Sequence, residues 1–115
     1  MQIYTVSFSG IPDHEAIYIK NSNENTGTLY HIIGSPLEGF TFNIKEQYIP
    51  SNSASYVPNS LKYIKDTNLS LNQLTDLLKN IPVQGPIPFN QVRKMKRGID
   101  YGDCRTWVKN ALEII

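Results

Sequence analysis

The chain has 115 residues with 11 basic and 10 acidic side chains, which leaves a formal net charge of +1. A chain of this length fits one domain and buries about two thirds of the surface that it exposes when unfolded, so we expect a single domain over residues 1–115. The balanced charge gives no electrostatic reason to expect nucleic acid as a partner or a strongly acidic substrate.

The chain carries a single cysteine, which cannot form an internal disulfide. An unpaired thiol is typical of a reducing compartment. No apolar run approaches the roughly 18 to 20 residues that span a bilayer, and the first residues lack the basic start and apolar core of a signal peptide. These features predict a soluble cytoplasmic protein with no integral membrane segment.

Five stretches have the pattern of β-strands. Residues 2–8 alternate polar and apolar side chains, and residues 40–45 do the same. Residues 14–20 and 27–33 are rich in β-branched and aromatic side chains and are separated by a short polar turn, which is typical of a β-hairpin. Residues 61–65 are a further short candidate. The pattern predicts an antiparallel sheet of four to five strands.

The register of the hairpin decides how close the two histidines of the chain lie. If Lys20 pairs with Gly27, His31 lies across from Ala16. His14 shares a face with Ala16 because side chains alternate along a strand. His14 and His31 then become diagonal neighbours, roughly 7 Å apart at the backbone.

One helix is expected after the strands. Ser70 is a good N-cap, and the leucines at positions 71, 74, 77 and 78 fall on one face of a helix that ends near Asn80, before Pro82. A leucine stripe of this kind is typical of a core-facing surface. We expect this helix to pack on the sheet.

Three segments lack a regular pattern. Residues 49–60 are rich in proline, serine and asparagine and predict a loop over the sheet or near the site. Residues 82–88 contain three prolines and predict an extended connector. Residues 91–97 carry four positive charges. Such a run is typical of a solvated surface, and a nuclear address or a phosphate-binding patch has the same composition.

The last thirteen residues hold the cysteine at an expected helix start. Asp103 is a good N-cap, and Cys104 then takes the first helical position. There the unpaired backbone N–H groups and the positive end of the helix dipole favour a thiolate over a thiol. The apolar residues that follow share one face of this C-terminal helix: Trp107, Val108, Ala111, Leu112 and Ile115.

A reactive thiolate needs a base, and His14 and His31 are the two histidines of the chain. We expect His14 to hold the Cys104 thiolate in an ion pair and His31 to fix the tautomer of His14. This requires that the histidine face of the hairpin meets the start of the last helix. Two other interpretations stay open. In the first, Cys104 is a small buried residue that packs with Trp107, and the histidines are satisfied strand residues. In the second, Cys104, His14, His31 and either Asp103 or Asp13 bind Zn²⁺.

Three motifs resemble those of a known group of enzymes. In the order of the chain they are His14-Glu15-Ala16-Ile17-Tyr18-Ile19, Tyr30-His31-Ile32 and Asp103-Cys104-Arg105-Thr106-Trp107-Val108. They are similar to a His-Trp-Ala-Ile-Tyr-Val strand, a second histidine strand and an Asn-Cys-Glu-His-Phe-Val helix start. The group is the circularly permuted papain-like thiol enzymes, which include the lecithin:retinol acyltransferase family, permuted NlpC-type hydrolases and PPPDE peptidases. The combination also resembles that of small uncharacterised fungal proteins.

The resemblance implies a circularly permuted papain-like (NlpC-like) α+β fold, in which the antiparallel sheet packs against a C-terminal helix and a second helix. It implies a hydrolase or acyltransferase that uses a triad of Cys104, His14 and His31 and an acyl-enzyme intermediate. The bond attacked would be an amide, ester or thioester in a peptide, isopeptide or acyl-lipid substrate, without a cofactor or metal. The alternative is a papain-like module without turnover that binds a protein, peptide or lipid partner.

Overall fold

The computed structural model describes residues 1–10, 13–21, 25–92 and 103–115. Its elements confirm the α+β class that the sequence pattern predicts. They are β1 (Gln2–Phe8), β2 (His14–Lys20), β3 (Gly27–Ser35), β4 (Gly39–Tyr48), the 3₁₀ helix η1 (Pro50–Asn52), β5 (Lys62–Asp66), α1 (Leu71–Lys79), α2 (Phe89–Val92) and α3 (Cys104–Ile114).

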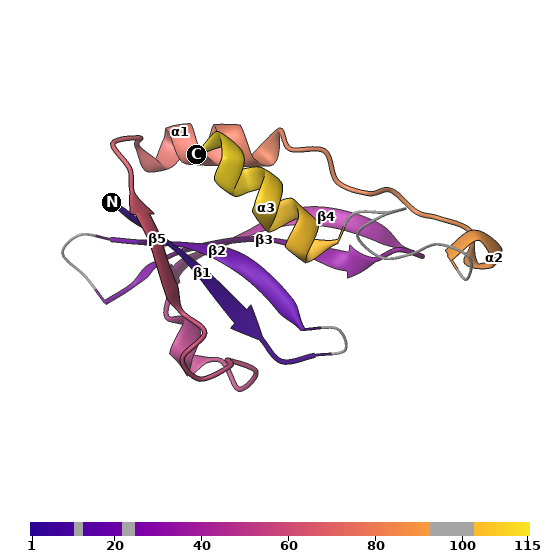
Figure 1. Cartoon of the computed structure of the whole chain (residues 1–115), viewed down its shortest axis with the longest axis horizontal. Helices are drawn as coiled ribbons and strands as arrows, with labels where there is room; N and C mark the ends of the chain where they lie inside the picture. Colours follow the sequence, from indigo (N-terminus) through magenta and orange to yellow (C-terminus); the bar gives the residue numbers. More distant parts are fainter. Residues whose placement is uncertain (11–12, 22–24, 93–102) are drawn as a thin grey trace.

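The five strands form one antiparallel sheet in the order β4-β3-β2-β1-β5. The first four strands follow one another across the sheet, and β5 then returns to pair with β1 at the opposite edge. Figure 1 shows α1 and α3 together on one side of the sheet and the segment that carries η1 on the other. The two faces of the sheet therefore have different coverings.

The hairpin of β2 and β3 has the predicted register. Lys20 pairs with Gly27, and Ile17 pairs with Tyr30. Glycine is required at position 27 because a Cβ there would collide with the carbonyl oxygen of Ile19. The register brings the start of β2 and the middle of β3 together, which is the geometry that the histidines need.

A bulge on each outer strand adjusts which side chains face the core. On β5, Ile3 pairs with Lys65 and Tyr4 pairs with Tyr63, so Ile64 is an extra residue. Ile64 packs against the core under the helices. A bulge bends its strand and re-aims side chains, and here it turns an isoleucine inward on an otherwise exposed strand.

The bulge on β4 lies close to the histidines. Leu29 pairs with Lys45 and Gly27 with Tyr48, so β4 has one residue more than β3 between these pairs. Gln47 in this bulge has a φ of 48°, which places it in the left-handed region. As a result, Lys45 and Tyr48 lie together, with the Lys45 ammonium 5.3 Å from the centre of the Tyr48 ring.

Aliphatic and aromatic side chains fill the face of the sheet under α1 and α3. Ser70 caps α1 as predicted, because its hydroxyl accepts from the Gln73 N–H while the Gln73 side chain accepts from the Ser70 N–H. The buried members of this helix-side core are Ile3, Ile17, Ile19, Tyr30, Ile32, Leu74, Leu78, Cys104, Trp107, Val108 and Ala111.

The opposite face of the sheet lies under the irregular segment 49–60, in agreement with the predicted loop. The Ser9 N–H donates to the Ser55 carbonyl at 2.6 Å, and the Val57 N–H donates to the Ser7 carbonyl at 3.1 Å. The buried members of this loop-side core are Val6, Phe8, Ala16, Tyr18 and Leu29, with Tyr4, Tyr48 and Tyr56 packed against them.

The connector 82–88 has no regular structure, as expected, and it runs beside the start of β4. The Phe40 N–H donates to the Gln84 carbonyl at 2.8 Å, and the Ile87 N–H donates to the Pro36 carbonyl at the same distance. Of the basic run 91–97, residues 93–97 lie outside the described residues.

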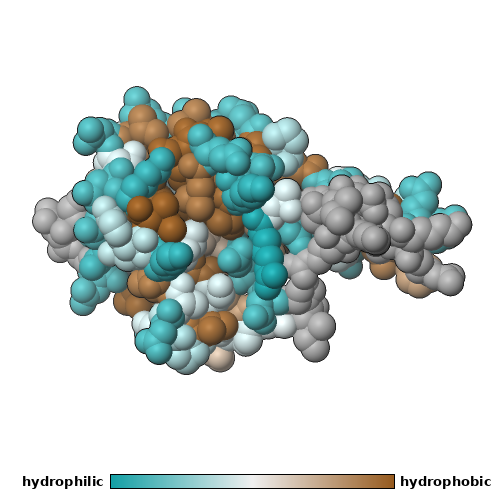
Figure 2. Space-filling view, in the orientation of Figure 1, coloured by the Kyte–Doolittle hydropathy of each residue, from teal (hydrophilic) through white to brown (hydrophobic). Residues whose placement is uncertain are grey.

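The surface beside the two longer helices is partly apolar. Leu77 of α1 is 39% exposed and Ile114 of α3 is 47% exposed. Figure 2 shows apolar side chains gathered over this part of the molecule. Within the described ranges, every helix is too short or too polar to cross a bilayer.

Candidate active site

His14 and His31 form the centre of the candidate site. Nε2 of His14 lies 2.7 Å from Nδ1 of His31, within hydrogen-bond distance. His14 opens β2 and His31 lies inside β3, so the predicted register is what joins residues 17 positions apart. The His14 ring also contacts Phe8, with 6.2 Å between the ring centres.

Asn43 on β4 fixes the proton positions of this pair. Nε2 of His31 lies 3.0 Å from Oδ1 of Asn43, and a carbonyl oxygen only accepts hydrogen bonds. In neutral His31, Nε2 therefore carries the proton and Nδ1 accepts the bond from the Nε2–H of His14. The arrangement leaves Nδ1 of His14 as an unprotonated ring nitrogen that is free to act as a base.

Burial keeps both imidazoles neutral near pH 7. Burial, the neighbouring His31 and the Lys45 ammonium lower the pKa of His14 from 6.5 to about 4. Burial is also the main cause that lowers the pKa of His31, against the opposing effect of its bond to Asn43. The free protein therefore has a neutral His14 at pH 7, which differs from the imidazolium that the expected ion pair requires.

Cys104 occupies the predicted position at the start of α3. The Asp103 side chain accepts from the N–H groups of Arg105 at 3.1 Å and Thr106 at 3.2 Å, which confirms the N-cap. The Cys104 side chain is buried and belongs to the helix-side core. Its sulfur accepts from the Glu15 N–H at 3.5 Å and lies 3.8 Å from the Asp13 carbonyl oxygen.

The Cys104 sulfur lies where β2 and β3 diverge beyond the last pair of their ladder, a place that we call the fork. Ser7 and Glu15 are opposed in the β1–β2 ladder, but the N–H and C=O of Ser7 both bond to the segment 57–60. Opposed antiparallel residues exchange both hydrogen bonds or neither, so the Glu15 N–H points away from β1 and toward β3. The β2–β3 ladder reaches only to Ile17 and Tyr30. The thiol occupies the space beyond that last pair.

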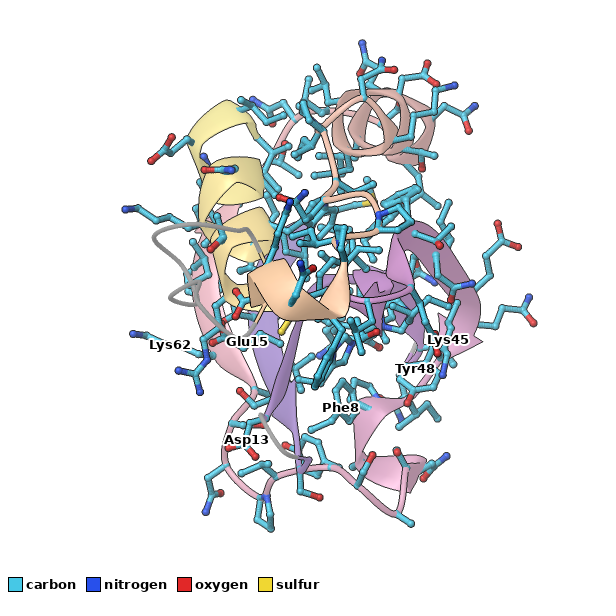
Figure 3. The ribbon with its side chains drawn as sticks, turned by 90° about the vertical axis from the view of Figure 1, so that its right-hand side faces the viewer. Phe8, Asp13, Glu15, Lys45, Tyr48 and Lys62 are labelled. Atoms are coloured by element: carbon cyan, nitrogen blue, oxygen red, sulfur yellow. The ribbon has the colours of Figure 1, made fainter. Side chains whose placement is uncertain are left out.

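The histidine pair and α3 lie on different faces of the sheet, contrary to the expectation from the sequence. Ile17 and Tyr30 pack under the helices, and side chains alternate along strands. His14 and His31 therefore point to the face of Phe8 and the loop-side core. Figure 3 shows Glu15 below the first turn of α3, whereas Phe8, Lys45 and Tyr48 lie together on the other side of the strand. The Cys104 sulfur contacts the main chain at Asp13 and at Glu15, on either side of His14.

The loop side holds a small cavity next to the histidines. It has a volume of about 70 Å³ and is lined by His31, Lys45, Tyr48, Phe8 and two serines of the segment 49–60. In the described part of the chain, no three His, Cys, Asp or Glu side chains gather as metal ligands would.

Sequence reasoning missed Asn43, although a signal for it was present. Asn43 lies between Phe42 and Ile44 in an alternating strand, and it pairs with His31 across the sheet. An amide opposite a buried histidine is a natural partner for the second ring nitrogen. Extending the predicted hairpin register to the next strand would have found it.

These observations define an α+β protein with a thiol at a helix start and a linked histidine pair at the neighbouring strand. Residues 3–114 match the model of a family of unknown function (DUF6540), and the chain belongs to this family. Comparisons with curated proteins and with solved structures gave no match.

Proposed function

We propose that the protein is a cysteine-dependent hydrolase or acyltransferase with a circularly permuted papain-like fold. The observation that carries the proposal is the relay from Asn43 through His31 to His14, which ends on a free Nδ1 beside the main chain that the Cys104 sulfur contacts. The imidazole is buried and oriented by His31, and the thiol contacts the main chain on either side of His14, so a nucleophile and a candidate base lie at the same end of β2. The four residues lie on β2, β3, β4 and α3.

In the first step, Nδ1 of His14 accepts the thiol proton while Sγ of Cys104 attacks the carbonyl carbon of an amide, ester or thioester. The carbonyl oxygen becomes an oxyanion. Asp103 caps the N–H groups of Arg105 and Thr106 and leaves that of Cys104 outside the cap, where it can bind this oxyanion. His31 stays neutral and holds the His14 ring in place.

In the second step, the intermediate collapses and the leaving group takes the proton from Nδ1 of His14. An acyl group remains on Sγ as a thioester. Water, or a second acceptor with an N–H or O–H group, then gives its proton to His14 and attacks this thioester. Cys104 recovers its proton and the acyl group leaves as an acid, an amide or an ester.

The proton transfer requires a local rearrangement of Cys104 and His14. The sulfur lies 3.5 Å from the Glu15 nitrogen, and that nitrogen is bonded to the carbonyl carbon of His14. We expect rotation about the Cα–Cβ bond of Cys104, together with a local shift of the main chain at residues 13–15, to bring the sulfur to Nδ1 of His14 while the bond between His14 and His31 stays in place. Catalytic hydrogen bonds commonly tighten only when substrate is bound.

The second candidate is a papain-like binding module without turnover. It is favoured by the burial of the Cys104 side chain, which is 7% exposed, and by the main-chain contacts of its sulfur. A structural cysteine has these properties. The two candidates differ in the reactivity of the thiol.

Alkylation by iodoacetamide separates them. We expect Cys104 to be labelled at a rate that falls by about 10²-fold to 10⁴-fold in His14→Ala, because general-base assistance is lost. Glu15→Gln is the matched control, since it keeps the main-chain N–H that the sulfur contacts. An unchanged rate in His14→Ala would mean that Cys104 is a structural residue. A panel of fluorogenic esters, thioesters and amides then gives the bond that is cleaved.

A further inference from the structure

The small cavity on the loop side of the sheet borders the histidine pair but takes no part in the proposed reaction. Its volume is about 70 Å³. Apolar side chains of β1 and β3 line part of it, and its polar lining residues are His31, Lys45, Tyr48, Ser53 and Ser55. A water molecule takes about 30 Å³ in the liquid, so the cavity has room for a group of about three or four heavy atoms.

Lys45 brings a positive charge to this cavity. Its ammonium lies 5.3 Å from the centre of the Tyr48 ring, and Figure 3 shows the two residues together on the loop side. After burial, the charge of Lys45 is one of the causes that lower the pKa of both His14 and His31. In the described part of the chain, no carboxylate lies within ion-pair distance of this ammonium. The cavity therefore borders a cation without an anionic partner.

Two serines of the segment 49–60 add a hydroxyl donor. The Oγ atoms of Ser53 and Ser55 lie 3.0 Å apart, so one hydroxyl donates to the other. The Ser55 N–H also donates to Oγ of Ser53, at 3.3 Å. Whichever hydroxyl donates, the other keeps an O–H hydrogen that no acceptor among the described residues takes up. An ammonium and a hydroxyl together favour a ligand that is negatively charged and only accepts hydrogen bonds.

We propose that this cavity binds a carboxylate group, which accepts from the ammonium of Lys45 and from the remaining hydroxyl of Ser53 or Ser55. A carboxylate with the carbon that bears it matches the volume, and its single charge matches the one lysine among the described lining residues. A phosphate is larger and carries more charge than this lysine offsets. The inference goes beyond the proposed function, since it holds whether or not Cys104 turns over a substrate.

A bound carboxylate changes the proton affinity of the histidine pair. It places a negative charge beside His31 and offsets that of Lys45, so it favours the protonated imidazoles and raises the pKa of His14 and His31. Binding and protonation are reciprocal, so the protonated pair binds the carboxylate more tightly by the same factor. The cavity thus couples a small acid to the protonation of the candidate base.

The other titratable groups around the pair are placed differently. The Asp13 carboxylate accepts from the main chain of the preceding turn, and it does not line the cavity. Glu15 and Cys104 belong to the helix side of the sheet. Tyr48 and Tyr56 face the loop side as phenols, which are uncharged near neutral pH. Among the described residues, one lysine therefore supplies the charge that faces both the cavity and the pair.

Formate titration of the full chain labelled with ¹⁵N tests the site at pH 7, with sodium formate replacing sodium chloride at constant ionic strength. Formate is a carboxylate of matching size, and formamide is its neutral counterpart. We expect the amide resonances of Lys45, Ser53 and Ser55 to shift in a saturable way with formate and not with formamide. A cavity that holds only water gives no saturable formate shift. That result, or equal shifts with formamide, overturns the proposal.

A second carboxylate gives the source of the ligand. Tighter binding of N-acetylaspartate methylamide than of formate assigns the cavity to a carboxylate on a peptide side chain, and the reverse order assigns it to a free acid. At saturating formate, the pKa of His14 should rise by about one unit, as followed by NMR of its ring protons. An unchanged pKa would place the bound anion away from the pair and overturn the coupling.

Lys45→Met tests the cation. It should weaken formate binding by about tenfold, because the ligand loses its charged donor. Lys62→Met is the matched control, since Figure 3 shows Lys62 on the opposite side of the molecule from Lys45. Equal affinity in the two variants would contradict the proposal. Binding here needs no turnover, so an inert thiol in the alkylation experiment and an absence of formate binding are separate results.

Discussion

The two faces of the sheet use the same strands for different purposes. The helix side is a continuous core in which α1 and α3 cover Ile17, Ile19 and Tyr30. The loop side is partly aromatic and covered by the irregular segment 49–60, and it carries the histidine pair and its cation neighbour Lys45. Strand alternation makes this division, because each strand gives every second side chain to each face.

The helix side of the sheet contributes most of the stability, whereas the loop side carries the polar groups of the candidate site. Regular helices over branched side chains bury much apolar surface, which is the main favourable term in folding. Polar side chains in a small loop-covered cavity contribute less to stability but keep fixed proton positions. Cys104 belongs to the helix side and reaches the fork between β2 and β3, where the two faces meet. Substitutions on each face should therefore separate the two properties.

The largest expected effect is on the helix side. Leu74→Ala removes a fully buried side chain and should lower the free energy of unfolding by about 2–5 kcal/mol, because it loses apolar burial and leaves a cavity. Urea denaturation measures this value. Leu77→Ala is the matched control on the same helix, and its 39% exposure predicts a loss of less than about 1 kcal/mol. Equal losses would mean that α1 does not anchor the core.

On the loop side, Asn43→Leu should cost about 1–3 kcal/mol of stability, because the buried Nε2–H of His31 loses its acceptor. Without this acceptor, either ring nitrogen of His31 can carry the proton, so the proton position of His14 is no longer fixed. We expect Cys104 alkylation to slow by about tenfold to a hundredfold, which is part of the rate increase that a general base supplies. Thr41→Val, on the same strand and face, is the control. Alkylation that stays at the wild-type rate would show that the relay does not serve the thiol.

The pH dependence of stability reports the histidine pair. The native pKa of His14 is about 4, below the unfolded value of 6.5, so the unfolded chain binds a proton in this interval and the native chain does not. Stability should therefore fall as the pH is lowered from 6.5 to 4, and it should be level above about pH 7.5. The urea midpoints of wild type and His14→Gln, plotted against pH, should run parallel above pH 7.5 and diverge below pH 6.5. Parallel curves over the whole range would contradict the lowered pKa.

The smallest expected effect concerns Lys45. Lys45→Met removes a positive charge that disfavours protonated His14, so the pKa of His14 should rise, as followed by NMR of its ring protons. Lys45 is exposed, and the difference from wild type should shrink at 0.5 M salt because exposed charges are screened. Lys62→Met on β5 is the control for loss of a surface charge. A shift of the same size in both variants would remove Lys45 from the site.

Local signals in the sequence predicted most elements of the fold. The alternation and the turn gave the hairpin register, which the pair of Lys20 and Gly27 confirms. Ser70 and Asp103 were identifiable as N-caps because Ser or Asp directly before a helical apolar repeat commonly caps the helix. The proximity of His14 and His31 followed from the register alone. These predictions depend on residues that are close in the chain or joined by one turn.

The remaining features depend on partners that local patterns do not specify. The pairing of β5 with β1 is a choice between sheet edges, and β5 has no hydrophobic alternation to guide it. Alternation placed His14 and His31 on one face, but it does not say which face receives α3. The pKa of His14 is set by burial under a loop with no regular pattern. This lowered pKa disfavours the imidazolium that the expected ion pair requires, and local patterns do not reveal it.

The bulges described above also affect how the protein behaves at high concentration. An open sheet edge is a template for strand addition by another chain, and natural proteins blunt it with bulges, lysines and covering segments. On one edge, β5 is short, bulged at Ile64 and flanked by exposed Lys62 and Lys65. On the other, the connector bonds to Phe40, and the β4 bulge at Gln47 interrupts the ladder. Both edges of the sheet therefore oppose strand addition by another chain, independently of the core.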